Sequence, residues 1–179
     1  MPNYIAMLRG INVSGHKIIK MEHLRESFGA LGFGNVKTYV QSGNVVFEAP
    51  HDTAASLTKK IEQKIMRDFG FSVPVLLKTS QDMEKIIQRN PLLKVSGIDH
   101  SKLHVTFLAA DPPKTSPDLL RPLAAAAEKF HISGREIYLY CPDGYGITKL
   151  SNVAIEKKLS VGATTMNWKT VNTLSAMAR

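Results

Sequence analysis

The first segment of the chain is apolar at odd and even positions alike, and this feature constrains the fold more than any other. Residues 3–9 read Asn-Tyr-Ile-Ala-Met-Leu-Arg, with the apolar run in the centre. A strand with one face in water alternates apolar and polar side chains, whereas a strand without alternation is covered on both faces. The segment is therefore predicted to be a central strand of a sheet that is packed on both sides.

The elements that follow are typical of one small α+β fold. Apolar residues at helical spacing predict two helices that Gly32 and Gly70 end, and short β-branched and aromatic runs predict strands. The predicted strands cover 3–9, 36–40, 45–48 and 73–78, and the predicted helices cover 21–31 and, after a cap at Asp52 or Thr53, the segment up to Phe69. The order βαββαβ predicts a ferredoxin-like α-β plait.

The second half of the chain has a similar but incomplete order. The predicted elements are a short helix capped by Ser80, a strand over 103–109, a helical segment over 117–129, a strand region over 132–141 broken at Ser133-Gly134, and two final helices that open at Ser151 or Asn152 and at Asn167. This βαββα order with a terminal helix predicts a degenerate second plait. We therefore expect two subdomains, 1–79 and 80–179, packed tightly because no low-complexity linker separates them.

Two polar clusters lie at strand ends that the predicted plait brings together. They are Arg9, Gly10 and Asn12 after the first strand, and Ser42, Gly43 and Asn44 before the third. Right-handed crossovers make these two strands antiparallel neighbours, so the clusters should converge. An arginine fork, amide and hydroxyl donors, and glycines that admit backbone amides together predict an anion site. The alternative is a pair of ordinary turns in which Arg9 is paired with an acid.

The net charge of +8 is concentrated at the two ends of the chain. Residues 1–21 carry three basic residues and no acid, and residues 149–179 carry five basic residues against Glu156 alone. Clustered like charge predicts an anionic partner, either a small nucleotide-like molecule or nucleic acid. The alternative is a basic surface that is only solvated.

Residues near the C-terminus are predicted to complete the anion site. Trp168 can stack on a base or a sugar, while Lys149 and Lys169 can contact phosphates. The alternative is structural, because a lone tryptophan is often a core anchor and Asn167 is a common residue at a helix N-cap.

Other features of the sequence narrow the function classes. No apolar stretch approaches the roughly 18–20 residues that a membrane span needs, and no signal sequence precedes the first strand, so we expect a cytoplasmic protein without membrane association. A lone Cys141 fits a reducing compartment. The six histidines are scattered without metal-ligand spacing, so we expect neither a metal site nor a cofactor.

The residues alone are compatible with three functions. The first is a binding module for an anionic, phosphate-bearing ligand. The second is an enzyme that acts on a phosphorylated or carboxylated small molecule in a cleft between subdomains, with Ser42 or Glu156 as a reacting group. The third is a protein-interaction module that uses its basic ends on an acidic protein. Self-association is compatible with each.

The chain also resembles a known family over nearly its whole length. The motifs that carry the resemblance are Tyr4-Ile5-Ala6-Met7-Leu8-Arg9-Gly10-Ile11-Asn12-Val13, Met21, Leu31-Gly32-Phe33, Thr38-Tyr39, Ser42-Gly43-Asn44-Val45-Val46-Phe47, Thr148-Lys149-Leu150 and Asn167-Trp168-Lys169-Thr170-Val171. They are similar to domain-of-unknown-function family 1697. The resemblance implies a mainly bacterial, cytoplasmic α+β protein with two ferredoxin-like subdomains, and it implies no catalytic residues. The chain departs from the family pattern at Ser14, where glycine is common, and at Met166, where arginine is common.

Overall fold

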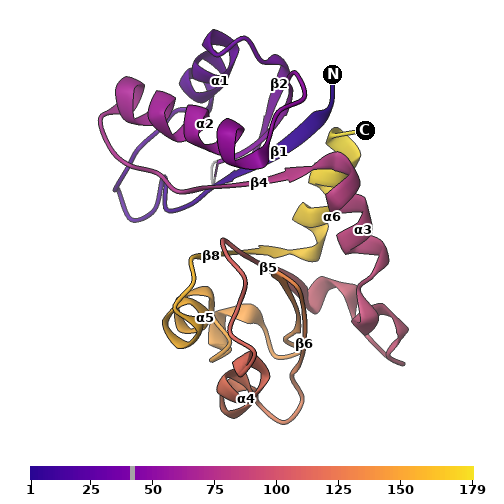
Figure 1. Ribbon diagram of the computed structural model, residues 1–179. Coiled ribbons are helices and arrows are strands. Elements are labelled where there is room, and N and C mark those ends of the chain that lie inside the picture. The colour runs from indigo at the N-terminus through magenta and orange to yellow at the C-terminus, as the bar shows by residue number, and fades with distance from the viewer. Residues whose placement is uncertain (41–42) are drawn as a thin grey trace. The chain divides into compact units, whose positions relative to one another are not determined.

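The chain divides into two compact units, each built around one antiparallel sheet. A computed structural model describes residues 1–40 and 43–179. The first unit comprises Met1–Glu84 and Thr173–Arg179, and the second comprises Lys85–Asn172. Each unit holds one four-stranded sheet with helices beside it (Figure 1). The fold is thus a mixed α+β fold.

The first unit has β1 at the centre of its sheet. Its elements are β1 (Asn3–Leu8), α1 (Met21–Ala30), β2 (Gly34–Tyr39), β3 (Asn44–Glu48), α2 (Ala54–Phe69), β4 (Val75–Thr79) and the start of α3 (Ser80–Gln88). The strand order is β2-β3-β1-β4, and every neighbouring pair is antiparallel. The antiparallel pairing of the first and third strands in the centre, expected from the sequence, is confirmed.

Helices α1 and α2 cover the same face of this sheet (Figure 1). Their apolar stripes meet the side chains of Tyr4, Ala6 and Leu8 in one cluster. Phe47 on β3 fills its middle, with ring centroids 5.3 Å from Phe28 and 4.7 Å from Phe33. The alternate residues of β1 are buried as well, because Ile5 and Met7 are 0% exposed. Both faces of β1 are therefore covered, as its unbroken apolar run predicts.

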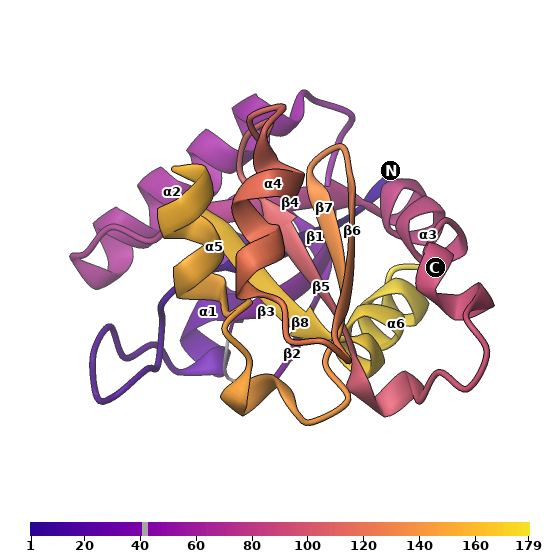
Figure 2. The ribbon, with the colours of Figure 1, turned by 90° about the horizontal axis from the view of Figure 1, so that it is seen from below.

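The second unit repeats the same order of strands. Its elements are η1 (Pro91–Lys94), η2 (His100–Lys102), β5 (Leu103–Leu108), α4 (Ser116–Leu120), η3 (Arg121–Leu123), β6 (Lys129–Ser133), β7 (Glu136–Tyr140), η4 (Tyr145–Ile147), α5 (Asn152–Leu159), β8 (Ala163–Asn167) and α6 (Trp168–Met177), where η marks a 3-10 helix. The sheet order is β6-β7-β5-β8, again antiparallel throughout. Helices α4 and α5 lie on one face of this sheet (Figure 2), and their buried residues share a cluster with β5, β7 and β8.

Strand β8 was not predicted from the sequence. Its five residues alternate weakly, since only Ala163 and Met166 are buried, and they lie between two helical patterns. Pairing with β5 makes the segment a strand, and the hydroxyls of Thr106 and Thr165 lie 2.7 Å apart across that pair. A tertiary contact therefore decides the conformation where local propensity is neutral.

Two further predictions from the sequence were wrong. The helix expected over 117–129 ends as α4 at Leu120, followed by a 3-10 turn that contains Pro122, and β6 already begins at Lys129. Proline removes a helical hydrogen bond and clashes with the preceding turn, so it ends the helix. Ser80 does not cap α3, because the Thr79 hydroxyl accepts the hydrogen bond from Asp82 N at 3.0 Å.

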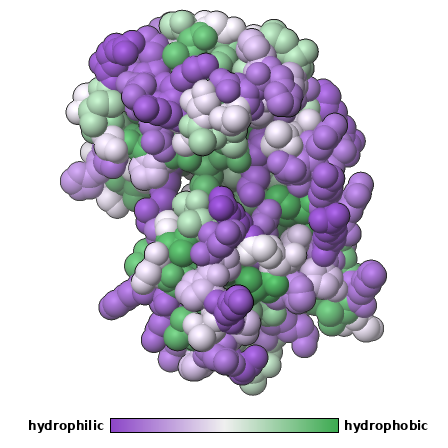
Figure 3. Space-filling view, in the orientation of Figure 1, coloured by the Kyte–Doolittle hydropathy of each residue, from purple (hydrophilic) through white to green (hydrophobic). Residues whose placement is uncertain are grey.

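The surface carries hydrophobic residues in a scattered pattern. Figure 3 shows hydrophilic and hydrophobic residues interspersed on the visible face of each unit. Scattered exposed apolar side chains are normal for globular domains. No helix within the described parts of the chain is both long and apolar enough to cross a membrane.

Candidate functional site

The end of β1 and the start of β3 meet at one edge of the first sheet. Leu8 N donates a hydrogen bond to Gly43 O at 3.0 Å, and Met7 lies opposite Asn44 in the β1–β3 register. The two polar clusters therefore converge, as the sequence predicts. We call this region the Arg9 edge, and it comprises residues 9–20 and Gly43–Asn44. Ser42, which was also predicted to belong to it, lies outside the described residues.

Only glycine fits at position 43 of the Arg9 edge. A Cβ atom at Gly43 would lie 2.5 Å from Ile11 Cδ1 and 2.9 Å from Leu8 Cβ. The backbone of Gly43 also has φ +88°, a conformation that other residues adopt only with strain. This close approach fixes the loop after β1 against the start of β3.

The side chain of Asn12 closes the loop that follows β1. Its Oδ1 accepts a hydrogen bond from Ile19 N at 2.8 Å, and its Nδ2 donates one to Ile19 O at 2.9 Å. Asn12 N also donates to Lys17 O at 3.1 Å. Residues 12–19 thus form a closed loop, and Asn12 contributes to the Arg9 edge by shaping it. Asn44 is similarly interior, with 3% of its surface exposed.

Left-handed backbone conformations are concentrated at the Arg9 edge. Six non-glycine residues in the described chain have positive φ angles, and three of them, Asn12, Ser14 and Lys17, lie within the closed loop. A fourth, Val40, precedes the start of β3 and is β-branched, which makes its φ of +54° a true outlier. Such strain persists only where surrounding contacts impose it, and it is common in ligand-binding loops.

Two basic residues of this edge contact the segment that precedes β4. The backbone N–H of Arg9 donates to Pro74 O at 3.0 Å, and the Lys17 side chain donates from Nζ to Ser72 O at 2.7 Å. The Arg9 residue is half-buried, while Lys17 and Lys20 are exposed. Helix α1 begins directly after Lys20, which makes no side-chain hydrogen bond to the first turn. The first backbone N–H groups of α1 therefore lack a side-chain cap.

The second unit has the same backbone frame without the arginine. Leu108 N donates to Arg135 O, and Ala109 N donates to Gly162 O, both at 2.8 Å. Ala109 thus stands where the first unit has Arg9. Arg135 is engaged with Asp111, whose Oδ1 lies 2.8 Å from its Nε, and this contact lowers the pKa of the Asp111 carboxyl. The arginine after the central strand is therefore specific to the first unit.

The C-terminal residues of the predicted site belong to the second unit. Asn167 Oδ1 accepts a hydrogen bond from Thr170 N at 2.8 Å, so Asn167 is the N-cap of α6. Trp168 is 8% exposed and lies in the core, whereas Lys149 and Lys169 are exposed. Met166, at the position where the family pattern often has arginine, is buried on β8.

Glu156, considered above as a reacting group, takes part in a polar network of the second unit. Its Oε1 accepts from Asn152 Nδ2 at 3.0 Å, and its Oε2 accepts from Ala163 N at 3.3 Å. The Asn152 amide also accepts from the Thr165 hydroxyl and donates to Ala163 O, both at 2.9 Å. These contacts tie α5 to β8. Within the described residues, no group of three or more His, Cys, Asp or Glu is arranged to hold a metal ion.

Comparison with known proteins identifies the family. The family model described as "Protein of unknown function (DUF1697)" matches residues 1–138. The chain belongs to this family. The resemblance drawn from the sequence motifs is thereby confirmed, and the matched segment of the DUF1697 chain contains the whole Arg9 edge.

One solved structure shows the same fold as this DUF1697 chain. The conserved bacterial protein SP0830 from Streptococcus pneumoniae superimposes with a TM-score of 0.74, and the match covers 99% of both chains at 22% sequence identity. Among curated proteins, none matches the chain. The structural neighbour therefore supports the fold.

Sequence reasoning missed one feature of the first unit. A cavity of about 320 Å³ lies at the opposite end of β1 from the Arg9 edge, lined in part by Asn3, Tyr4 and Thr79. The sequence gives no signal for it, because Tyr4 belongs to an apolar strand and reads as a core residue.

Proposed function

We propose that the chain is a binding module for an anionic, phosphate-bearing ligand, and that the Arg9 edge is its binding site. The observation that carries the proposal is the convergence of a closed, strained, basic loop with the start of β3. The ligand class comprises nucleotides and the phosphates of nucleic acid. Each unit is proposed to be a ferredoxin-like plait, with the boundary between subdomains near residue 79.

The charge of the Arg9 edge supports an anion. No acidic residue occurs before Glu22, while Arg9, Lys17 and Lys20 supply three positive charges in the same segment. Guanidinium donates two parallel hydrogen bonds to phosphate, and ammonium groups add charge without fixed geometry. The uncapped first turn of α1 begins at the end of this loop, where backbone N–H groups favour an anion.

Closure of the loop supports a preorganised site. The two hydrogen bonds between Asn12 and Ile19 and the contact of Ile11 with Gly43 set the loop before any ligand arrives. Preorganisation lowers the entropy lost on binding, so affinity rises without new contacts. For a long anion such as RNA, the exposed Lys149 and Lys169 are proposed as further phosphate contacts.

Binding of a fluorescently labelled single-stranded RNA at about 50 and 200 mM salt tests the proposal, with a panel of nucleotides as competitors. Arg9→Ala should weaken binding about 10–100-fold, because charge-assisted hydrogen bonds contribute about 1.5–3 kcal/mol each. Lys59→Ala is the matched control, since it removes one exposed positive charge from α2 in the same unit. It should leave affinity nearly unchanged.

The outcomes separate the two ligand sources. Binding that collapses with salt and resists nucleotides assigns nucleic acid, and full competition by one nucleotide assigns a small molecule. Either result supports the Arg9 edge if Arg9→Ala weakens it more than Lys59→Ala. Equal affinities of wild type, Arg9→Ala and Lys59→Ala would show that this placement is wrong.

A further inference from the structure

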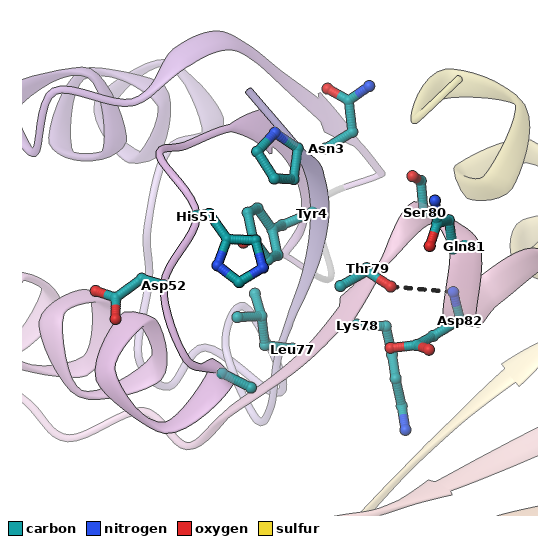
Figure 4. A pocket seen from close by; sticks show the side chains of 12 residues that line it. Asn3, Tyr4, His51, Asp52, Leu77, Lys78, Thr79, Ser80, Gln81 and Asp82 are labelled. Carbon is teal, nitrogen blue, oxygen red and sulfur yellow. Dashed lines mark hydrogen bonds between the residues drawn. The ribbon is translucent and has the colours of Figure 1, made fainter.

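The cavity opposite the Arg9 edge is built by four segments of the first unit. They are the start of β1, the loop before α2 with its first residue, the end of β4 and the first turn of α3 (Figure 4). Its volume of about 320 Å³ lies at the small end of the range for small-molecule sites, about 300–1,000 Å³. The cavity is therefore suited to a single small molecule.

Tyr4 is buried, whereas the other residues that line the cavity are partly or fully exposed. Its side chain is 3% exposed, and its ring stacks on Phe47 with centroids 5.6 Å apart. Within residues 1–40 and 43–179, the Tyr4 hydroxyl makes no hydrogen bond to another protein group, and it is not among the buried polar atoms that lack a partner, so solvent reaches it. Because Tyr4 lines the cavity, a ligand there can replace water at this hydroxyl.

Two further polar side chains line the cavity from different segments. His51 comes from the loop before α2, and Gln81 comes from the first turn of α3 (Figure 4). Both residues are exposed. An imidazole and a carboxamide can each donate and accept hydrogen bonds. Leu77 adds apolar surface from β4 beside His51 and Tyr4.

The charges around the cavity balance. The Asp52 carboxylate accepts from the Ser56 hydroxyl at 2.8 Å and from Lys60 Nζ at 3.1 Å, and these contacts hold the pKa of Asp52 below its ordinary value. Lys78 and Asp82, which also line the cavity, carry opposite formal charges. The cavity thus offers neutral donors and acceptors with an apolar surface, so a neutral polar ligand suits it better than an ion.

We propose that this cavity binds a nucleobase, either free or as part of a nucleoside. A nucleobase is planar and neutral, its faces are apolar enough to lie on Leu77, and its edge carries both donors and acceptors for the Tyr4 hydroxyl, His51 and Gln81. The proposal is independent of the anion site, because the two sites lie at opposite ends of β1.

Adenosine is the probe, titrated into the full-length, isotope-labelled chain and followed by NMR chemical shifts. Tyr4→Phe removes the hydroxyl and keeps the ring on Phe47, so it should weaken adenosine about 3–10-fold, the effect of one hydrogen bond. His51→Ala changes an exposed residue and should weaken binding similarly. The matched controls Tyr140→Phe and His131→Ala, both in the second unit, should bind adenosine like the wild type.

Several results would overturn the proposal. One is the absence of shifts at cavity residues with millimolar adenosine, and another is equal affinity of wild type, Tyr4→Phe and His51→Ala. Displacement of adenosine by ribose or inorganic phosphate alone would show that the base is not the part recognised. If Tyr4→Phe does not fold, His51→Ala decides the test. Arg9→Ala should bind adenosine normally, so failure of this site and failure of the anion site are distinguishable.

Discussion

Replacing Gly43 by alanine should destabilise the first unit by about 2–4 kcal/mol, far more than the same change at other glycines. The left-handed backbone alone costs a non-glycine residue about 1–2 kcal/mol, partly offset by about 0.4–1 kcal/mol because alanine restricts the unfolded chain. The new methyl group would also meet Ile11 Cδ1 at 2.5 Å, and overpacking of this kind costs about 1–3 kcal/mol.

Two control glycines separate these contributions. Gly10 has φ +74° with nothing within 4 Å of an added Cβ, so Gly10→Ala should cost about 1 kcal/mol from backbone strain alone. Gly29 lies in α1 with open space around it, so Gly29→Ala should stabilise the chain by about 0.5–1 kcal/mol through helix propensity. One chemical change thus has three different expected effects.

Urea titration followed by circular dichroism measures the free energy of unfolding. Hydrogen exchange of peptides from β1 and β3 shows whether the loss of stability lies in the first unit. Ile11→Val removes the nearest atom, so the double variant should lose less stability than the two single changes together. Equal costs for Gly43→Ala and Gly10→Ala would refute the close approach of Gly43 to Ile11.

Four other predictions follow from single side chains. Asn12→Ala removes both hydrogen bonds to Ile19, so it should lower the free energy of unfolding by about 2–3 kcal/mol in urea titration and speed exchange of the Ile19 amide. Ser14→Gly relieves an exposed residue at φ +51°, so it should raise the melting temperature slightly. Burial raises the pKa of Cys141 to about 11, so the folded thiol should stay unreactive toward iodoacetamide at pH 8 and react only on unfolding. Burial lowers the pKa of His104, so the folded state binds a proton at this residue less readily than the unfolded chain does. The free energy of unfolding should therefore fall as the pH drops below about 6.5, the ordinary pKa of histidine. His104→Gln should make the free energy of unfolding differ less between pH 5.5 and pH 7.5.

Topology could be predicted from the sequence where long elements fix it. The unbroken apolar run of β1 and the order of the following elements are enough to place Arg9 beside Gly43, although about 30 residues separate them. The role of Asn12 could not be predicted from the sequence, because Ile19 becomes its hydrogen-bond partner only when residues 12–19 fold into a closed loop. Nothing local distinguishes an asparagine that shapes a loop from one that contacts a ligand.

The second half of the chain shows a different limit of sequence reasoning. Strand β8 lies between two helices and has few apolar residues, so its identity depends on β5, which is remote in sequence. The nucleobase site depends equally on distant segments. Tyr4 resembles any other core residue until the loop at His51 and the first turn of α3 are placed around the cavity that it lines.

The assignment of the last residues to the first unit has a consequence for synthesis of the protein. Thr173–Arg179 group with Met1–Glu84, and Arg179 Nε lies 3.6 Å from Glu84 Oε1. A ribosome releases the N-terminal segment first, yet that segment receives its final residues only after all of Lys85–Asn172 has been made. The first unit therefore starts to be made before the second unit and is completed after it, and a premature stop before Thr173 would remove part of the first unit while leaving the sequence of the second unit whole.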